Sequence, residues 1–90
     1  MKVLKFGAVW CNGCLVMKPR WQEIEKQNPW LETQYFEFDD EPEAAKKYNI
    51  DKDGLPTFIF LDKNGKEFLR MSGEISKDKL VQIINENKDK

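Results

Sequence analysis

The chain contains only two cysteines among its 90 residues, Cys11 and Cys14. They follow an apolar run that predicts a buried strand over residues 2–9, and they precede a helical pattern from about residue 15 to residue 27. A spacing of three positions is close to one helical turn, so the two sulfurs can face each other. The unpaired N–H groups at a helix N-terminus stabilise a thiolate relative to a thiol. A thiolate with a second thiol within reach is the arrangement that thiol–disulfide exchange requires.

A Cys-x-x-Cys pair can also be half of a metal site or an inert disulfide. A zinc or iron–sulfur site needs about four soft or nitrogen ligands, and this chain has no histidine and no further cysteine. Only a second copy of the chain, or exogenous thiols, could complete such a site. We therefore favour redox chemistry without a metal. In this interpretation Cys11 attacks, because we expect it to be the more exposed and to lie nearer the helix end, and Cys14 resolves the mixed disulfide.

Length and composition are those of one ordinary globular domain, residues 1–90, with 40% apolar residues and 34% charged residues. The formal net charge is −1, and no run of like charges predicts a nucleic acid or a membrane surface as partner. No apolar run is long enough to span a membrane. The sequence begins inside the first strand, so we expect no secretory peptide, a cytoplasmic location and a monomer.

Turn and cap signals place the remaining elements. We expect strands over residues 34–39, 57–61 and 67–71, and helices from residue 42 to about 48 and from residue 77 to about 87. Asp40 is predicted to cap the first of these helices, with Glu43 in the capping-box position, and Ser76 to cap the second. Asn64-Gly65 is typical of a two-residue type I′ hairpin turn.

The element order is therefore β-α-β-α-β-β-α, which predicts an α/β fold with a four-stranded mixed sheet. The opening β-α-β unit gives a right-handed parallel pair, the hairpin adds two antiparallel strands, and helices cover both faces. The apolar positions expected of the first helix are Leu15, Val16, Met17, Trp21 and Ile24. Pro19 should kink this helix, and we expect Trp21 and Trp30 to lie in the core.

Four separated motifs resemble those of the thioredoxin fold family and together cover almost the whole chain. Residues 10–14, Trp-Cys-Asn-Gly-Cys, are similar to the family's redox motif, and Pro19 matches its helix-kinking proline. Residues 55–57, Leu-Pro-Thr, resemble the segment whose cis proline faces the cysteines. Residues 60–65 and 73–80 look like the final hairpin and helix.

This resemblance implies a thiol–disulfide oxidoreductase that acts on disulfide-bearing protein substrates. The Cys11–Cys14 disulfide would be its redox group, with no bound cofactor. Electrons would come from a thioredoxin-reductase-like protein or from another thiol donor. The resemblance also implies that Pro56 is cis, so that Leu55 can offer its N–H and C=O to an extended substrate strand.

Three departures from the family pattern affect the expected site. The opening β-α unit of full-length thioredoxins is missing, which leaves a smaller, glutaredoxin-like core. Asn12-Gly13 replaces the usual Gly-Pro between the cysteines, and glycine makes closure of the disulfide ring entropically more costly. Lys5 stands where the family has a buried acid. It could reach water or pair with a carboxylate such as Glu37. Our hypothesis is that its ammonium lies behind Cys14 and favours that thiolate.

Other functions remain open at this point. Trp10 is either one more core aromatic or an apolar shoulder beside the sulfurs that contacts a partner protein. A glutathione-dependent reductase has the same size of core, but Trp10 and the lack of an aromatic residue between the cysteines argue against it. The chain could also be a binding module with an incidental disulfide, or a cluster carrier that dimerises through Cys11.

Overall fold

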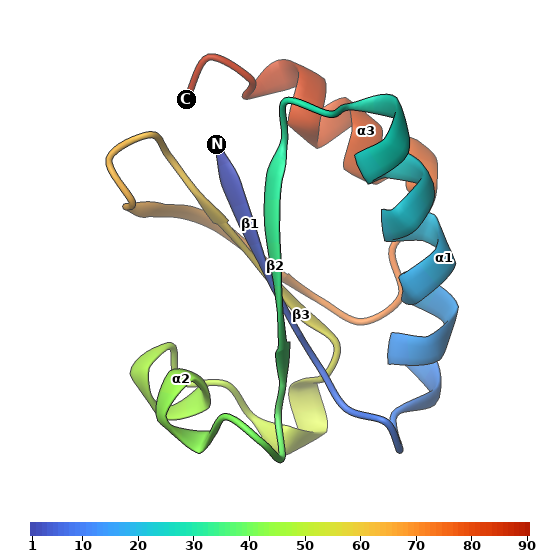
Figure 1. Ribbon diagram of the computed structural model, residues 1–90, viewed down its shortest axis with the longest axis vertical. Coiled ribbons are helices and arrows are strands. Elements are labelled where there is room, and N and C mark those ends of the chain that lie inside the picture. Colours follow the sequence, from blue (N-terminus) through green and yellow to red (C-terminus); the bar gives the residue numbers. More distant parts are fainter.

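The computed structural model describes all 90 residues, and it contains a four-stranded mixed sheet with helices on both faces (Figure 1). The elements are β1 (Lys2–Gly7), α1 (Asn12–Gln27), β2 (Glu32–Glu37), α2 (Pro42–Lys47), the short 3-10 turn η1 (Lys52–Gly54), β3 (Thr57–Leu61), β4 (Glu67–Ser72) and α3 (Lys77–Glu86). The strand order is β2-β1-β3-β4, with β1 parallel to β2 and the other pairs antiparallel. The predicted element order and the α/β fold are confirmed.

Two hydrophobic clusters lie on opposite faces of the sheet. The larger one fills the space under α1 and α3 and contains Val3, Met17, Trp21, Ile24, Leu31, Phe58, Phe60, Ile75, Leu80 and Ile84. The smaller one lies on the α2 side and is centred on Leu4, Phe6, Ile59 and Leu61. All five residues of β3 are buried, because this central strand is covered on both faces. None of the helices is both long and apolar enough to cross a membrane.

Helix α1 begins earlier than expected and buries a narrower stripe. Its buried residues are Met17, Trp21 and Ile24, spaced as one face of a helix requires. Leu15 and Val16, which we expected among the apolar positions of this helix, lie outside this stripe and are exposed. Trp21 is a core residue as predicted. The same prediction for Trp30 was wrong, because its side chain is exposed in the turn before β2.

Strand β1 ends at Gly7, two residues before the expected limit. The N–H of Cys11 donates to the C=O of Ala8 across 3.1 Å, so the chain turns immediately after the strand. Val9 is left 76% exposed on this turn. The turn carries the cysteines to the edge of the molecule, and β1 ends directly beneath them.

Two local predictions, the cap by Asp40 and the type I′ hairpin turn, were wrong because the N–H groups at these positions are bonded to other acceptors. The N–H groups of Asp40 and Glu41 both donate to the C=O of Glu37, so Glu41 is the N-cap residue of α2 and makes no side-chain cap. In the hairpin, Asp62 N–H donates to Lys66 C=O, which leaves a three-residue loop, residues 63–65. Only its last residue, a glycine, has a positive φ, whereas a type I′ turn needs two such residues. The predicted cap of α3 by its preceding serine is confirmed.

Candidate active site

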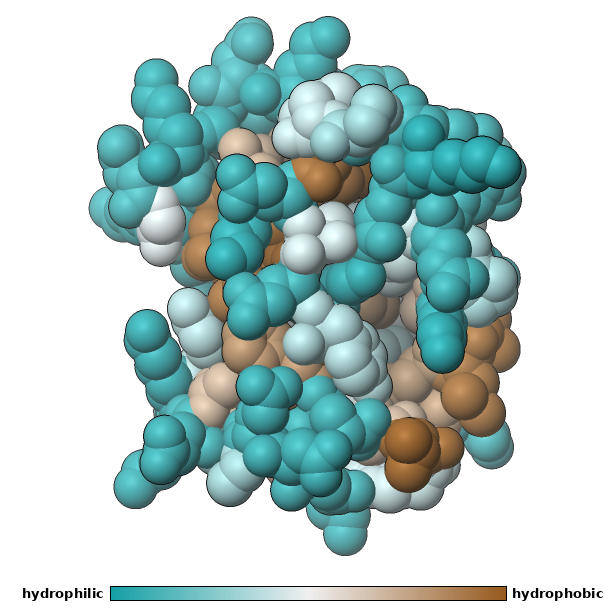
Figure 2. All heavy atoms as spheres, viewed as in Figure 1, coloured by the Kyte–Doolittle hydropathy of each residue, from teal (hydrophilic) through white to brown (hydrophobic).

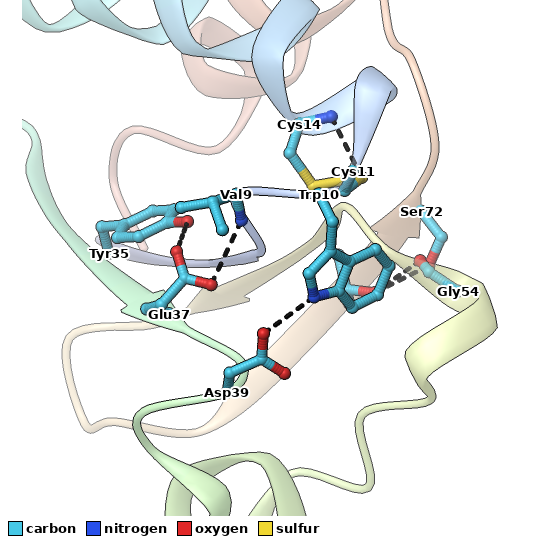
Figure 3. Close-up of a disulfide and its surroundings, with 10 residues drawn as sticks. Val9, Trp10, Cys11, Cys14, Tyr35, Glu37, Asp39, Gly54 and Ser72 are labelled. Carbon is cyan, nitrogen blue, oxygen red and sulfur yellow. Dashed lines mark hydrogen bonds between the residues drawn. A yellow bond between two sulfur atoms is a disulfide. The ribbon is translucent and has the colours of Figure 1, made fainter.

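Cys11 and Cys14 lie at the junction of β1 and α1 and form a disulfide, with 5.2 Å between their Cα atoms. Cys11 is the N-cap residue of α1 and has an extended backbone. Its Sγ accepts the N–H of Cys14 across 3.2 Å (Figure 3). The first sulfur therefore lies at the positive end of a helix of 16 residues, where a thiolate is stabilised.

The expected difference in exposure between the two cysteines was wrong. Cys11 is only 9% exposed, whereas Cys14 is half-buried. The reason is that Cys14 lines an open cavity on the α1 side of the sheet. The two sulfurs therefore differ in their surroundings and not in the way expected from exposure. Cys11 Sγ lies at the end of the helix, and Cys14 lines the cavity.

Trp10 is 47% exposed and is not a core residue. Its indole Nε1–H donates to Asp39 Oδ2 across 2.8 Å, and Lys52 Nζ lies 5.9 Å from the centre of the ring (Figure 3). The bond to Asp39 holds the ring beside the disulfide with one face uncovered. Sequence reasoning missed Asp39, which is 29 positions away and reaches Trp10 only because β2 pairs with β1.

The Leu55–Pro56 peptide bond is cis, as the resemblance implied. A Cβ on Gly13 would lie 3.2 Å from Pro56 Cδ, so the proline ring packs against the residue between the cysteines. Asn12, the other inter-cysteine residue, is exposed. Neither the N–H nor the C=O of Leu55 has a hydrogen-bond partner in the protein. An extended peptide passing the disulfide would find these two backbone groups free.

The cavity next to Cys14 has a volume of about 420 Å³ and also receives the side chain of Lys5. Lys5 pairs with a carboxylate, which was one of the alternatives left open, but the partner is not Glu37. Its Nζ donates to Oε2 of Glu25 on α1, and Thr33 donates to the same oxygen. Lys5 projects from the sheet face that α1 covers, so the nearest carboxylate comes from this helix. The ammonium therefore lies in the cavity behind Cys14, but it is matched by a carboxylate.

A second polar pair, Tyr35 and Glu37, lines the same cavity. The Tyr35 hydroxyl donates to Glu37 Oε1 across 3.0 Å, and Glu37 Oε2 accepts the N–H of Val9 across 3.3 Å (Figure 3). Burial of the hydroxyl and the bond to Glu37 raise the pKa of Tyr35 to about 12. Sequence reasoning treated Tyr35 only as a strand aromatic. The missed signal is the two-residue period of β2, which puts both side chains on the same face of the sheet. On that face Tyr35 is paired in register with Lys5 of β1, and Glu37 with Gly7.

A family model described as Thioredoxin matches residues 1–86. The chain belongs to the thioredoxin family. The thioredoxin of Chlamydia caviae is 32% identical over 85 residues, which make up 94% of this chain and 80% of the relative. The thioredoxin of Fasciola hepatica has a solved structure with a TM-score of 0.84 at 35% identity, covering 96% of this chain and 79% of that one. A malarial protein with a TM-score of 0.85 but 23% identity shows the shared fold alone.

Family membership and the cysteine geometry together establish the activity. The protein is a thiol–disulfide oxidoreductase of the disulfide-reductase kind, with Cys11–Cys14 as its dithiol–disulfide couple. Members of this family use the disulfide itself as redox group and in general draw electrons from thioredoxin reductase. In this chain the couple lies between a helix N-terminus, a cis proline and a cavity that contains two carboxylates.

Proposed function

We propose that this protein reduces disulfide bonds in protein substrates with Cys11 as the nucleophile and Cys14 as the resolving thiol. The observation that carries the proposal is the position of Cys11 Sγ at the N-cap of α1. The Cys11 thiolate attacks one substrate sulfur, so that a mixed disulfide forms and the first substrate thiolate leaves. Cys14 then attacks the Cys11 sulfur, and the second substrate thiolate leaves. Two electrons pass to the substrate, whose two thiolates each take up a proton.

In this proposal the substrate binds as an extended strand beside Pro56. The unpartnered N–H and C=O of Leu55 support it, because they can extend the substrate's backbone hydrogen bonding. Trp10 supplies a flat apolar surface on the other side of the sulfurs. Val9 and Leu15 are also exposed around the cysteines, and Figure 2 shows hydrophobic atoms gathered near the N-terminal end of α1. An apolar rim of this kind suits partially unfolded or loop-borne disulfides.

The proposal includes the expected partners. The disulfide is the only redox group required, because the two thiols supply both electrons. A thioredoxin-reductase-like protein or a thiol pool would reduce the couple again. We further propose that the protein acts as a monomer in the cytoplasm, without a nucleic acid or membrane partner. Light scattering of the reduced protein would check that it is a monomer, and cell fractionation would check its location.

The test is the reduction of insulin by dithiothreitol, followed by turbidity, in the presence of the wild-type protein and its cysteine variants. We expect Cys11→Ser to abolish the acceleration, and Cys14→Ser to accumulate mixed disulfides with substrate on Cys11. Adducts on Cys14 in the Cys11→Ser protein would reverse the two roles. A wild-type protein that binds insulin chains but does not accelerate their reduction would contradict the proposal.

A further inference from the structure

Resolution of the mixed disulfide requires Cys14 to lose a proton, and the cavity behind Cys14 determines where that proton can go. Lys5, which enters the cavity from β1, is an ammonium and has no acceptor site for it. The remaining candidates are two carboxylates, Glu25 from α1 and Glu37 from β2.

The two carboxylates differ in their partners. Glu25 Oε2 already accepts from the Lys5 ammonium and from the Thr33 hydroxyl, so the charge of this carboxylate is matched by a cation. Glu37 forms no ion pair, and its two oxygens accept only from the neutral groups Tyr35 O–H and Val9 N–H. Glu37 is therefore the carboxylate of the cavity that has no counter-ion.

The hydroxyl of Tyr35 is bonded to Glu37 and shares a neighbour, Gly7, with Cys14. A Cβ on Gly7 would lie 3.1 Å from Tyr35 Oη and 3.2 Å from Cys14 Sγ, so both atoms lie against the same bare glycine. Two atoms this close to one point are near enough for one bridging water, although no direct hydrogen bond joins them.

We propose that Tyr35 and Glu37 are the proton acceptor of Cys14. The Cys14 proton passes through one bridging water to Tyr35 Oη, while the hydroxyl proton of Tyr35 moves to the Glu37 carboxylate. The Cys14 sulfur then bonds to the Cys11 sulfur, the substrate thiolate leaves, and Glu37 returns the proton to this thiolate or to solvent. When the disulfide is reduced again, the same path returns a proton to Cys14. This inference rests on the proposed role of Cys14 as the resolving thiol.

The electrostatic surroundings agree with this direction of transfer. The high pKa of Tyr35 keeps its hydroxyl protonated at neutral pH, so it can donate to Glu37 as it accepts from Cys14. The other charged groups that face the pair are Lys5 on β1, Lys18 and Glu25 on α1, and Asp40 after β2. The residues of β3 that line the cavity carry no charge. No cation is bonded to Glu37 in this environment.

The experiment separates the two steps by stopped-flow fluorescence of the tryptophan next to the disulfide, with reduced protein and an excess of a disulfide peptide. The observed rate constant rises with peptide concentration while attack limits the reaction. At high peptide concentration it reaches a plateau, and this plateau is the rate constant of resolution. We expect Tyr35→Phe and Glu37→Gln to slow resolution about tenfold or more at pH values below the ordinary thiol pKa of about 8.5, and to leave the attack rate unchanged. At higher pH, where hydroxide can remove the thiol proton without a neighbouring base, the three proteins should converge.

Two matched variants serve as comparisons. Tyr48→Phe removes a hydroxyl that has no hydrogen bond in the protein, on a ring that packs against Phe6 on the other face of the sheet, and it should follow the wild type at every pH. Glu25→Gln changes the second carboxylate of the same cavity and should not slow resolution.

Three other outcomes would overturn the inference. Resolution slowed by Glu25→Gln and not by Glu37→Gln would assign the proton to the other carboxylate. Slowing by the same factor at all pH values would make the pair structural. Faster resolution in Glu37→Gln would mean that Glu37 acts only as a charge that opposes the Cys14 thiolate. In each case the insulin assay and the cysteine variants would still report on the proposed function independently.

Discussion

Gly7, the last residue of β1, is the position where the structure makes the sharpest prediction about stability. It is buried, and its φ is not positive, so the backbone itself would accept alanine. The added methyl group would lie 3.1 Å and 3.2 Å from two atoms of Tyr35 and 3.2 Å from Cys14 Sγ. These distances are shorter than the optimal separation of about 3.5–4.0 Å between nonbonded carbon atoms.

The neighbours differ in how easily they can move. The Cys14 sulfur is held by the disulfide, whereas Tyr35 is half-exposed and can swing outward. That movement would break its bond to Glu37, at a cost of about 0.5–1.5 kcal/mol, and the contact with sulfur would remain. Overpacking of this kind costs about 1–3 kcal/mol, and alanine recovers about 0.4–1 kcal/mol from the unfolded chain. We therefore expect Gly7→Ala to lower the free energy of unfolding of the oxidised protein by up to about 2.5 kcal/mol.

Urea unfolding of the oxidised protein measures this loss, with Gly54→Ala as a matched control. Gly54 also has a φ that is not positive, but a Cβ there would lie 3.6 Å and 3.9 Å from its neighbours, which is ordinary contact. The control should be unchanged or more stable by about 0.4–1 kcal/mol. If Gly7→Ala were as stable as Gly54→Ala, the tyrosine hydroxyl and the sulfur would not share the space above Gly7, and the proposed proton path would lose its geometric basis.

Three further predictions concern the surroundings of the disulfide. An absorbance titration should show one tyrosine that ionises near pH 12, and Tyr35→Phe should remove this transition. Because the pKa of Tyr35 is raised above its ordinary value of 10.0, the protonated hydroxyl stabilises the folded state below pH 10. This stabilisation is lost as the pH rises through 12. Asp39→Ala removes the acceptor that holds the Trp10 indole and should lower kcat/KM for insulin roughly two- to tenfold, which corresponds to one hydrogen bond, while a small disulfide is unaffected. Lys5→Met removes the ammonium behind Cys14, whose positive charge favours the Cys14 thiolate, and should therefore slow resolution by Cys14 but not the first attack. Equal resolution rates would make Lys5 a structural residue.

The sequence by itself determined the order of the elements, the fold class and the position of the redox pair. These features depend on short-range physics. A strand followed by a helix brings a Cys-x-x-Cys pair to a helix end, and a serine before an amphipathic pattern caps the helix that follows. Two local signals still failed. Asp40 does not cap its helix, because the C=O of Glu37 accepts the N–H groups of Asp40 and Glu41. The type I′ turn does not form, because the carboxylate of Asp62 accepts the N–H groups of Asn64 and Lys66.

Only the tertiary structure decided which side chains meet around the sulfurs. Lys5 pairs with a residue 20 positions away and Trp10 with one 29 positions away. Neither partner follows from local propensity. The register of β1 on β2 sets which residues face each other, and the path of α1 over the sheet sets which carboxylate reaches Lys5. Burial is decided in the same way. Leu15 and Trp30 are apolar but exposed, because no other element covers them, whereas Gly7 leaves room for the Tyr35 hydroxyl beside Cys14 only because two strands and a helix meet at that point.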